Sequence, residues 1–198
     1  MRFPPKHEAR QLSLVPILLV AAALGCGNDG LGGLPGISVS LDISDQKIPG
    51  FAPPSAQASC AVNVPGSGAL SSDSLQPISL DLKSSKELQG RSVLRFTKVK
   101  LEHVDLNIIP PSQTGQNWDF LDSIKLFADV PGRGDPPVLV AVLDPVPRGV
   151  TSIRIAGTGA DISDIASADR FEVRGEVSGR PPCADVHFDG DAKFEVSL

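Results

Sequence analysis

The sequence predicts an all-β domain, an antiparallel β-sandwich of about eight to ten short strands with one short helix. Three observations lead to this prediction. Apolar and polar residues alternate with a period of two in several stretches, which is typical of strands with one buried and one solvated face. Glycine and proline are frequent, at 19 and 18 of 198 residues, and they lie between these stretches, where they predict turns. One short segment, 161–166, has a clear helix signal, with Asp161 as its expected N-cap.

The first half of the chain contains three clear strand candidates and one weaker candidate. Between them lie two loop-like stretches rich in proline, glycine and serine, at 45–59 and 65–76. The clear candidates alternate apolar and polar residues, whereas the weaker one is a short mixed segment between the loops. The clear candidates are 37–44, 78–82 and 93–109, and the weaker one is 60–64.

The candidate strand 93–109 changes the parity of its apolar residues partway along. Leu101 and Val104 would face opposite sides of a regular strand, because their separation is an odd number. A β-bulge near Glu102 and His103 inserts the extra residue that keeps both apolar side chains on the buried face. We therefore expect a bulge at this point.

The second half of the chain continues the pattern. The uniformly apolar segment 138–143 predicts a central strand that is covered on both faces. Residues 186–198 form either a pair of strands or one long bent strand, interrupted at Asp189–Asp191. The remaining expected elements are a helical turn leading into a strand at 120–130, a short strand at 153–155, and a strand at 171–177.

The first 25 residues have the organisation of a secretory signal. A basic start with Arg2, Lys6 and Arg10 is followed by the uncharged apolar run 14–24. This run is shorter than the roughly 20 residues that a membrane-spanning helix needs. A buried N-terminal helix is the alternative, but such a helix should show a polar face at helical spacing, and the run has none.

The end of this segment is more specific. The residues Ala23-Leu24-Gly25-Cys26 resemble the lipobox of bacterial lipoproteins, although that family prefers leucine at the position held by Ala23. The resemblance implies that Cys26 is acylated, becomes the first residue of the mature protein and anchors it to a membrane. Gly27 rather than aspartate follows the cysteine, which in this family implies the outer membrane rather than the inner one. The resemblance covers residues 1–26, and the remainder is similar only to uncharacterised β-rich lipoproteins.

The predicted organisation is a signal peptide at 1–25, a lipidated cysteine with a glycine-rich tether at 26–36, and the β-domain at 37–198. Ten flexible residues span roughly 15–20 Å on average, and the alternative is an ordered arm on the domain. Residues 1–25 carry three basic side chains and one acidic side chain, so the formal charge of −5 becomes −7 for residues 26–198. This acidic balance argues against nucleic acid as a partner and against direct adhesion to anionic lipid.

Three cysteines are present, and the resemblance assigns Cys26 to lipid. Cys60 and Cys183 then remain as a pair in an oxidising compartment, which predicts a disulfide. Closing so long a loop would stabilise the fold by at most about 4–5 kcal/mol. Two free thiols are the alternative state.

Candidate chemistry is sparse, and we predict no catalytic residue, no metal site and no cofactor. His103 and His187 do not lie at metal-binding spacing with a cysteine or a second histidine, and no Gly-x-Ser-x-Gly elbow is present. Trp118 is expected to be a core or strand-edge anchor, with a ligand platform as the alternative. Two further patterns are weak: the Arg-Gly-Asp tripeptide 133–135, which three residues match easily by chance, and the possible calcium ligands Asp185, Asp189 and Asp191, which turn chemistry also explains.

These observations favour a lipid-anchored envelope protein that is not an enzyme and that acts by binding or as part of an assembly. Its expected partners are the membrane, through the lipid, and an envelope protein. The alternative is an envelope hydrolase or a carbohydrate-binding module. A clustered, partly buried acid or histidine in a deep pocket would favour an enzyme, whereas an exposed apolar patch would favour a partner.

Overall fold

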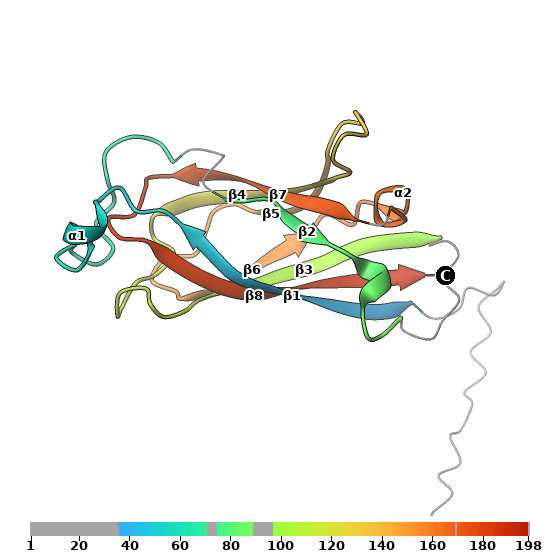
Figure 1. Ribbon diagram of the computed structural model, residues 1–198, viewed down its shortest axis with the longest axis horizontal. Helices are drawn as coiled ribbons and strands as arrows, with labels where there is room; N and C mark the ends of the chain where they lie inside the picture. Colours follow the sequence, from blue (N-terminus) through green and yellow to red (C-terminus); the bar gives the residue numbers. More distant parts are fainter. Residues whose placement is uncertain (1–35, 71–74, 89–96, 169, 198) are drawn as a thin grey trace, which may run out of the picture. The chain divides into compact units, whose positions relative to one another are not determined.

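The computed structural model describes residues 36–70, 75–88, 97–168 and 170–197. Within these residues, eight antiparallel strands form a single sheet with the order β1-β8-β3-β6-β5-β4-β7-β2 (Figure 1). The strands are β1 Ile37–Ile48, β2 Ile78–Leu80, β3 Lys98–Ile108, β4 Leu121–Asp129, β5 Val138–Leu143, β6 Ser152–Gly157, β7 Phe171–Gly179 and β8 Val186–Ser197. Three short helical segments complete the description: α1 Pro54–Gln57, the 3-10 turn η2 Leu82–Ser84, and α2 Ser163–Ala166.

The sheet curls until it is nearly closed. Ile43 of the edge strand β1 and Leu80 of the opposite edge strand β2 line the same apolar interior as Phe194 of β8. The all-β, antiparallel prediction is therefore confirmed, but the arrangement is barrel-like rather than two stacked sheets. Both arrangements bury one face of each strand, so the alternation of apolar residues is the same in either.

The predicted bulge in β3 is confirmed. The register between β3 and β8 shifts between Leu101 and His103, so that Glu102 has no partner on β8. Leu101 and Val104 are in consequence both buried. On the other side of β3, a Cβ atom at Gly157 would lie 1.9 Å from the carbonyl oxygen of Leu101, so only glycine fits there.

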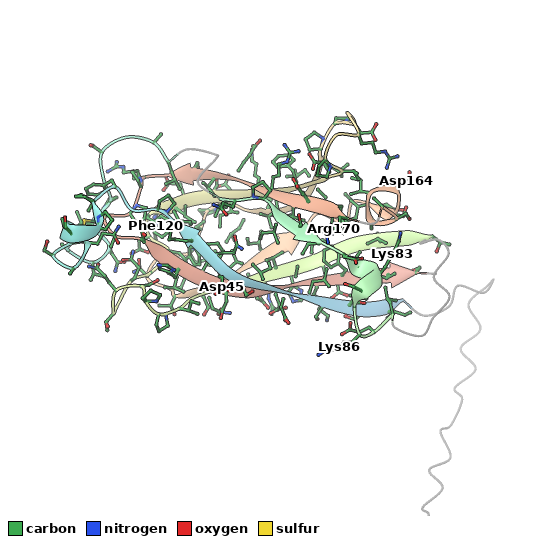
Figure 2. The ribbon with its side chains drawn as sticks, in the orientation of Figure 1. Asp45, Lys83, Lys86, Phe120, Asp164 and Arg170 are labelled. Carbon is green, nitrogen blue, oxygen red and sulfur yellow. A yellow bond between two sulfur atoms is a disulfide. The ribbon has the colours of Figure 1, made fainter. Side chains whose placement is uncertain are left out.

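Two groups of aromatic side chains pack in the core, one around Trp118 and the other formed by Phe171 and Phe194; Figure 2 labels Phe120, a member of the first group. The Trp118 ring lies 5.7 Å from the ring of Phe188 and 5.9 Å from that of Phe120, and its indole nitrogen donates to the carbonyl oxygen of Thr151 at 3.0 Å. Trp118 is 1% exposed, which confirms it as a core anchor. An apolar cavity of about 40 Å³ remains in the interior, which is room for a few water-sized spheres rather than for a ligand.

Several predicted elements differ from the structure. The segment 60–64 is not a strand, because Asn63 adopts a left-handed conformation with φ 61°. The segment before β4 is a single turn, closed by the bond from Leu121 N to Trp118 O at 3.0 Å, rather than a turn of helix. Of the two alternatives for 186–198, the one long strand is confirmed, and it continues through Asp189–Asp191. The helix α1 was not predicted. The predicted helix at 161–166 is confirmed from Ser163 onward, but its N-cap is Ile162 rather than Asp161. The carboxylate of Asp161 lies one residue earlier and accepts from the Ser163 amide at 3.0 Å and from the Val99 amide at 3.2 Å.

The strand β5 lies inside the sheet as predicted, but it is not fully covered. Val140 and Ala141 are buried, whereas its other four residues are half-buried. Among the residues described, no helix is both long and apolar enough to span a bilayer. The predicted signal, Cys26 and the tether up to residue 35 lie outside the described residues, as does the part of the predicted strand at 93–96.

Candidate functional site

The predicted pair Cys60 and Cys183 forms a disulfide, with Cα atoms 5.7 Å apart and 123 residues between them in the sequence. Cys60 lies after α1, in the connection between β1 and β2, and Cys183 lies just before β8. The bond thus ties an irregular segment to the strand that pairs with both β1 and β3. We call residues 51–66, which contain Cys60, the apolar loop.

Backbone hydrogen bonds fasten the two ends of the apolar loop to the same short segment, 181–183. These bonds lie on both sides of the disulfide, so that the loop is held at its ends and near its middle. The donors and acceptors are Phe51 N to Pro182 O at 2.9 Å, Ala52 N to Cys183 O at 3.0 Å, and Gly66 N to Pro181 O at 2.8 Å.

Asp185 adds a polar attachment at the start of the loop. Its carboxylate accepts hydrogen bonds from the Gly50 amide at 2.8 Å, from Gln57 Nε2 at 2.9 Å and from Lys47 Nζ at 3.0 Å. Partial burial by itself would raise the pKa of Asp185, but the hydrogen bonds from Gly50, Lys47 and Gln57 together hold that pKa below its usual value of 3.8. The carboxylate is therefore ionised at neutral pH, and it has a structural task.

The middle of the apolar loop is attached to residues 113–117. Asn63 donates to the carbonyl oxygen of Gly115 at 3.0 Å and accepts from the Asn117 amide at 2.9 Å. Gln113 donates to the carbonyl oxygen of Gln57 at 2.8 Å. Asparagine tolerates the left-handed conformation better than other non-glycine residues, so Asn63 both turns the loop and anchors it.

The apolar loop carries the exposed large hydrophobic side chains of the described chain. Phe51 is 55% exposed, Val64 is 52% exposed and Val62 is 38% exposed. Exposed prolines and alanines accompany them along the segment: Pro53, Pro54, Ala58, Ala61 and Pro65. The sequence from 51 to 66 contains no Asp, Glu, Lys or Arg. This is an uncharged surface in which apolar side chains predominate, with the exposed Ser55 and Ser59 among them, on a segment at the end of the sheet where α1 lies (Figure 1).

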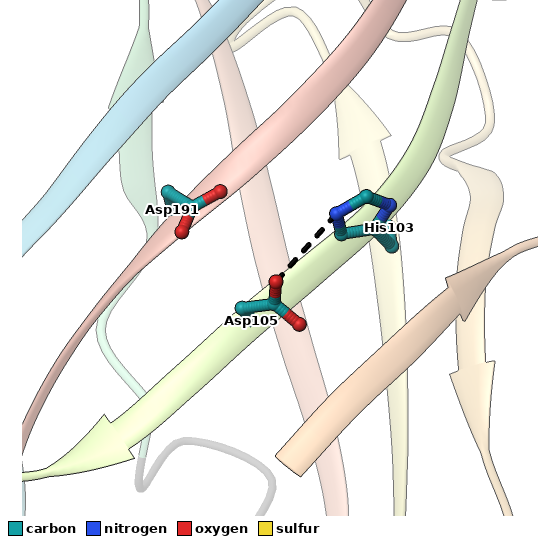
Figure 3. Close-up of side chains that lie close together, drawn as sticks. All are labelled: His103, Asp105 and Asp191. Carbon is teal, nitrogen blue, oxygen red and sulfur yellow. Dashed lines mark ion pairs between the residues drawn. The ribbon is translucent and has the colours of Figure 1, made fainter. Parts of the chain in front are cut away.

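A second group of side chains lies on the outer face of the sheet. His103 and Asp105 on β3 and Asp191 on β8 lie close together (Figure 3), and one ligand atom from each lies within 4.8 Å of the other two. His103 Nε2 is 3.6 Å from Asp105 Oδ2, and the two side chains are 20% and 25% exposed. The group lies beside an open groove rather than in a deep pocket.

Arg154 of β6 holds Asp105 from the other side. Its Nε and one terminal nitrogen donate to the two carboxylate oxygens, each at 2.6 Å. The hydrogen bond from Arg154 is the main cause that lowers the pKa of Asp105 below its usual value. Arg154 also interacts with Asp191, through charge alone. Within the described part of the chain, the Asp191 carboxylate has no hydrogen bond and no ion pair within 4 Å.

The sequence spacing predicted no metal or catalytic group, and it missed the grouping of His103 with Asp191. One signal was available: His103 and Asp105 follow the predicted bulge two residues apart, on the same face of one strand. The third member was not accessible, because Asp191 is brought opposite Asp105 only by the register of β8 against β3.

The three aspartates considered as calcium ligands are separated by the structure. The oxygens of Asp185 are occupied by the donors described above, whereas Asp191 belongs to the group with His103. Asp189 lies opposite Asn107 on β3. His187, the second histidine considered above, lies on β8, where its backbone amide donates a hydrogen bond to Ser112 Oγ at 2.7 Å.

In the tripeptide 133–135, Arg133 Nε and Asp135 Oδ2 form an ion pair at 2.7 Å. The two charges are thus paired with each other rather than presented separately to a partner.

Comparison with known proteins adds no assignment to any of these groups. No family model matches the chain, and no curated protein matches it.

Proposed function

We propose that this chain is an exported, lipid-anchored envelope protein whose β-domain is not an enzyme and binds a partner protein through the apolar loop. The disulfide indicates an oxidising, exported environment. The lipid on Cys26 and the outer membrane as its location are supported by the lipobox-like residues 23–26.

The observation that carries the binding proposal is the exposure of Phe51, Val62 and Val64 on one attached segment. Exposed apolar residues that gather in one place mark interaction sites in soluble domains. The disulfide and the hydrogen bonds to residues 181–183 hold this segment in place before any partner arrives. A surface that is already ordered loses less conformational entropy on association, so more of the contact energy remains for binding.

The chemistry of the loop indicates what kind of partner it fits. The cores of protein interfaces are depleted of charged residues and enriched in aromatic ones, and the apolar loop has Phe51 and no charge. The absence of lysine and arginine between 51 and 66 disfavours an anionic membrane surface, which needs basic side chains. The complementary surface is therefore an uncharged, apolar face of another protein.

The apolar loop and the first residue of β1 lie at opposite ends of one strand. The chain enters the domain at Ile37, the first residue of β1, and the apolar loop follows the other end of the same strand (Figure 1). A strand of 12 residues spans about 40 Å. The loop is therefore separated by the length of β1 from the point at which residues 26–36 join the domain.

Site-specific photo-crosslinking in the native envelope tests this proposal. A photoreactive residue replaces Phe51 in the full-length protein, and a matched control carries the same residue in place of Lys86, which lies near η2. We expect one envelope protein, identified by mass spectrometry, to be captured from position 51 and not from position 86. Adding Val62→Ser and Val64→Ser should abolish that adduct, because both residues are exposed contact groups.

The serine substitutions should leave stability nearly unchanged, within about 1 kcal/mol for the pair, since exposed substitutions usually change stability by less than 0.5 kcal/mol each. Equal capture from positions 51 and 86 would contradict the proposal, as would an adduct that survives both serines. Capture of lipid alone, or of a second copy of the chain alone, would also contradict it.

A further inference from the structure

We propose that His103, Asp105 and Asp191 form a binding site for a divalent transition-metal ion of the Zn²⁺ type on the outer face of the sheet. The inference is independent of the partner proposed above, because it concerns a different part of the domain. It rests on the geometry of the three side chains, on the bulge that orients two of them and on the charge balance around them.

The distances are compatible with one shared ion. The three ligand atoms lie within 4.8 Å of one another, so an ion at the centre of the triangle would be at most about 2.8 Å from each. Zinc lies about 2.0–2.2 Å from imidazole nitrogen and carboxylate oxygen. Each side chain would thus move by less than about 1 Å, which ordinary side-chain rotation supplies at half-buried positions.

The bulge in β3 gives His103 its orientation. Leu101 is buried, so in a regular strand His103 and Asp105 would also point into the core. The unpaired Glu102 reverses the parity and turns both side chains to the outer face. Glycines on both neighbouring strands approach β3 closely at this point: a Cβ atom at Gly157 or Gly190 would lie about 2 Å from a β3 carbonyl oxygen.

The charges around the group favour a cation. Asp191 lies directly opposite Asp105 on β3 and directly opposite Asp42 on β1, which places three carboxylates in one row across three strands. Like charges directly opposite each other on neighbouring strands destabilise a sheet. Arg154 is paired with Asp105 at the end of this row and acts on Asp191 through charge alone. A bound cation would neutralise the Asp191 carboxylate directly.

Arg154 is compatible with metal binding. Each oxygen of a carboxylate has two acceptor positions, and Arg154 uses one on each oxygen of Asp105. Hydrogen bonds to a ligating carboxylate are common around metal ions, where they orient the ligand. Lys193, the other nearby cation, lies directly opposite His103 on β8, and its ammonium is paired with Glu102 at 3.1 Å rather than with a member of the group.

The ligand types select the ion. One imidazole with two carboxylates suits zinc and similar transition-metal ions, whereas calcium takes six to eight oxygen ligands and no nitrogen. Three protein ligands leave at least one coordination position open for water.

Metal titration of untagged full-length protein in detergent tests the proposal. Co²⁺ serves as the spectroscopic probe, since its visible absorption changes when it is coordinated by nitrogen and oxygen, and Zn²⁺ is added to displace it. We expect one ion per chain. Asp191→Asn and His103→Gln should each weaken metal binding at least about tenfold. Loss of a residue that only hydrogen-bonds to a metal ligand already lowers metal affinity by about 10- to 100-fold, and loss of a ligand itself should lower it by no less.

Asp189→Asn is the matched control, because Asp189 lies on the same strand and face as Asp191 but outside the group. It should retain wild-type affinity within about twofold. Zn²⁺ should also raise the Tm of the wild type and of Asp189→Asn but not that of Asp191→Asn. Absence of saturable Co²⁺ binding would overturn the site, and so would equal weakening by Asp189→Asn and Asp191→Asn, which would show non-specific binding to an acidic surface. If one ligand variant does not fold, the other decides.

Discussion

Replacing Cys60 and Cys183 by serine should lower the free energy of unfolding by up to about 5 kcal/mol. The bond closes a loop of 123 residues, and the chain-entropy relation gives about 4.9 kcal/mol at 25 °C for a loop of that length. For a domain of this size, such a loss corresponds to a decrease in Tm of about 10–20 °C. Most of the effect arises in the unfolded state, which gains freedom when the bond is absent.

The native contacts around the bond should survive the substitution. Phe51, Ala52 and Gly66 remain hydrogen-bonded to residues 181–183, so the double variant should still fold. We therefore expect urea unfolding to shift to lower concentration with a steeper slope, because a more open unfolded chain exposes more surface.

Urea and thermal unfolding of the wild type, the double-serine variant and the chemically reduced wild type measure this effect. The reduced wild type is the control and should match the variant. A difference in unfolding free energy below about 1 kcal/mol would refute the reasoning. So would two alkylatable thiols at Cys60 and Cys183 in the protein isolated under non-reducing conditions.

Two further predictions concern Asp185 and Cys26. Because the pKa of Asp185 is lowered in the folded state, its stabilising contribution is fully present above the unfolded value of 3.8 and is lost as the pH falls through the folded pKa. Asp185→Asn should hence destabilise the protein at pH 7 by about 1–3 kcal/mol, as loss of hydrogen bonds to a charged group does. Urea unfolding should show that the difference in unfolding free energy between wild type and variant shrinks below about pH 4. A difference that is independent of pH would contradict this prediction. Cys26→Ser should release the protein into the soluble fraction, and a variant that remains in the membrane fraction would contradict the lipobox interpretation.

Alternation of apolar and polar residues was sufficient to predict most of the strands, because burial of one strand face imposes a period of two in any sheet arrangement. The same logic located the bulge, since Leu101 and Val104 can share the core only if one residue is inserted between them. These features depend on neighbouring residues within one strand, which is why the sequence contained them.

Features that depend on which strands become neighbours were not predictable. The near-closure of the single sheet depends on the strand order, which places β1 and β2 at its two edges. A sandwich would show the same alternation of apolar residues along each strand. The apolar loop was expected to be loop and strand, but the side chain of Asn63 and the disulfide give it another conformation. The grouping of Asp191 with His103 was not predictable for a similar reason, because it depends on the pairing of β8 with β3, two strands far apart in the sequence.

Both proposed sites depend on β8, yet they should act independently. Asp185, just before the strand, holds the start of the apolar loop, while Asp191 lies six residues further along in the group with His103. Six residues of strand span about 20 Å, and substitutions more than 7–10 Å apart with no shared partner have additive effects. β8 is hydrogen-bonded on both sides, to β1 and to β3, so it is held rigidly between the two sites. A metal ion at Asp191 would therefore strengthen the middle of the sheet without altering the loop, whereas loss of the Asp185 carboxylate would loosen the loop without altering the metal ligands.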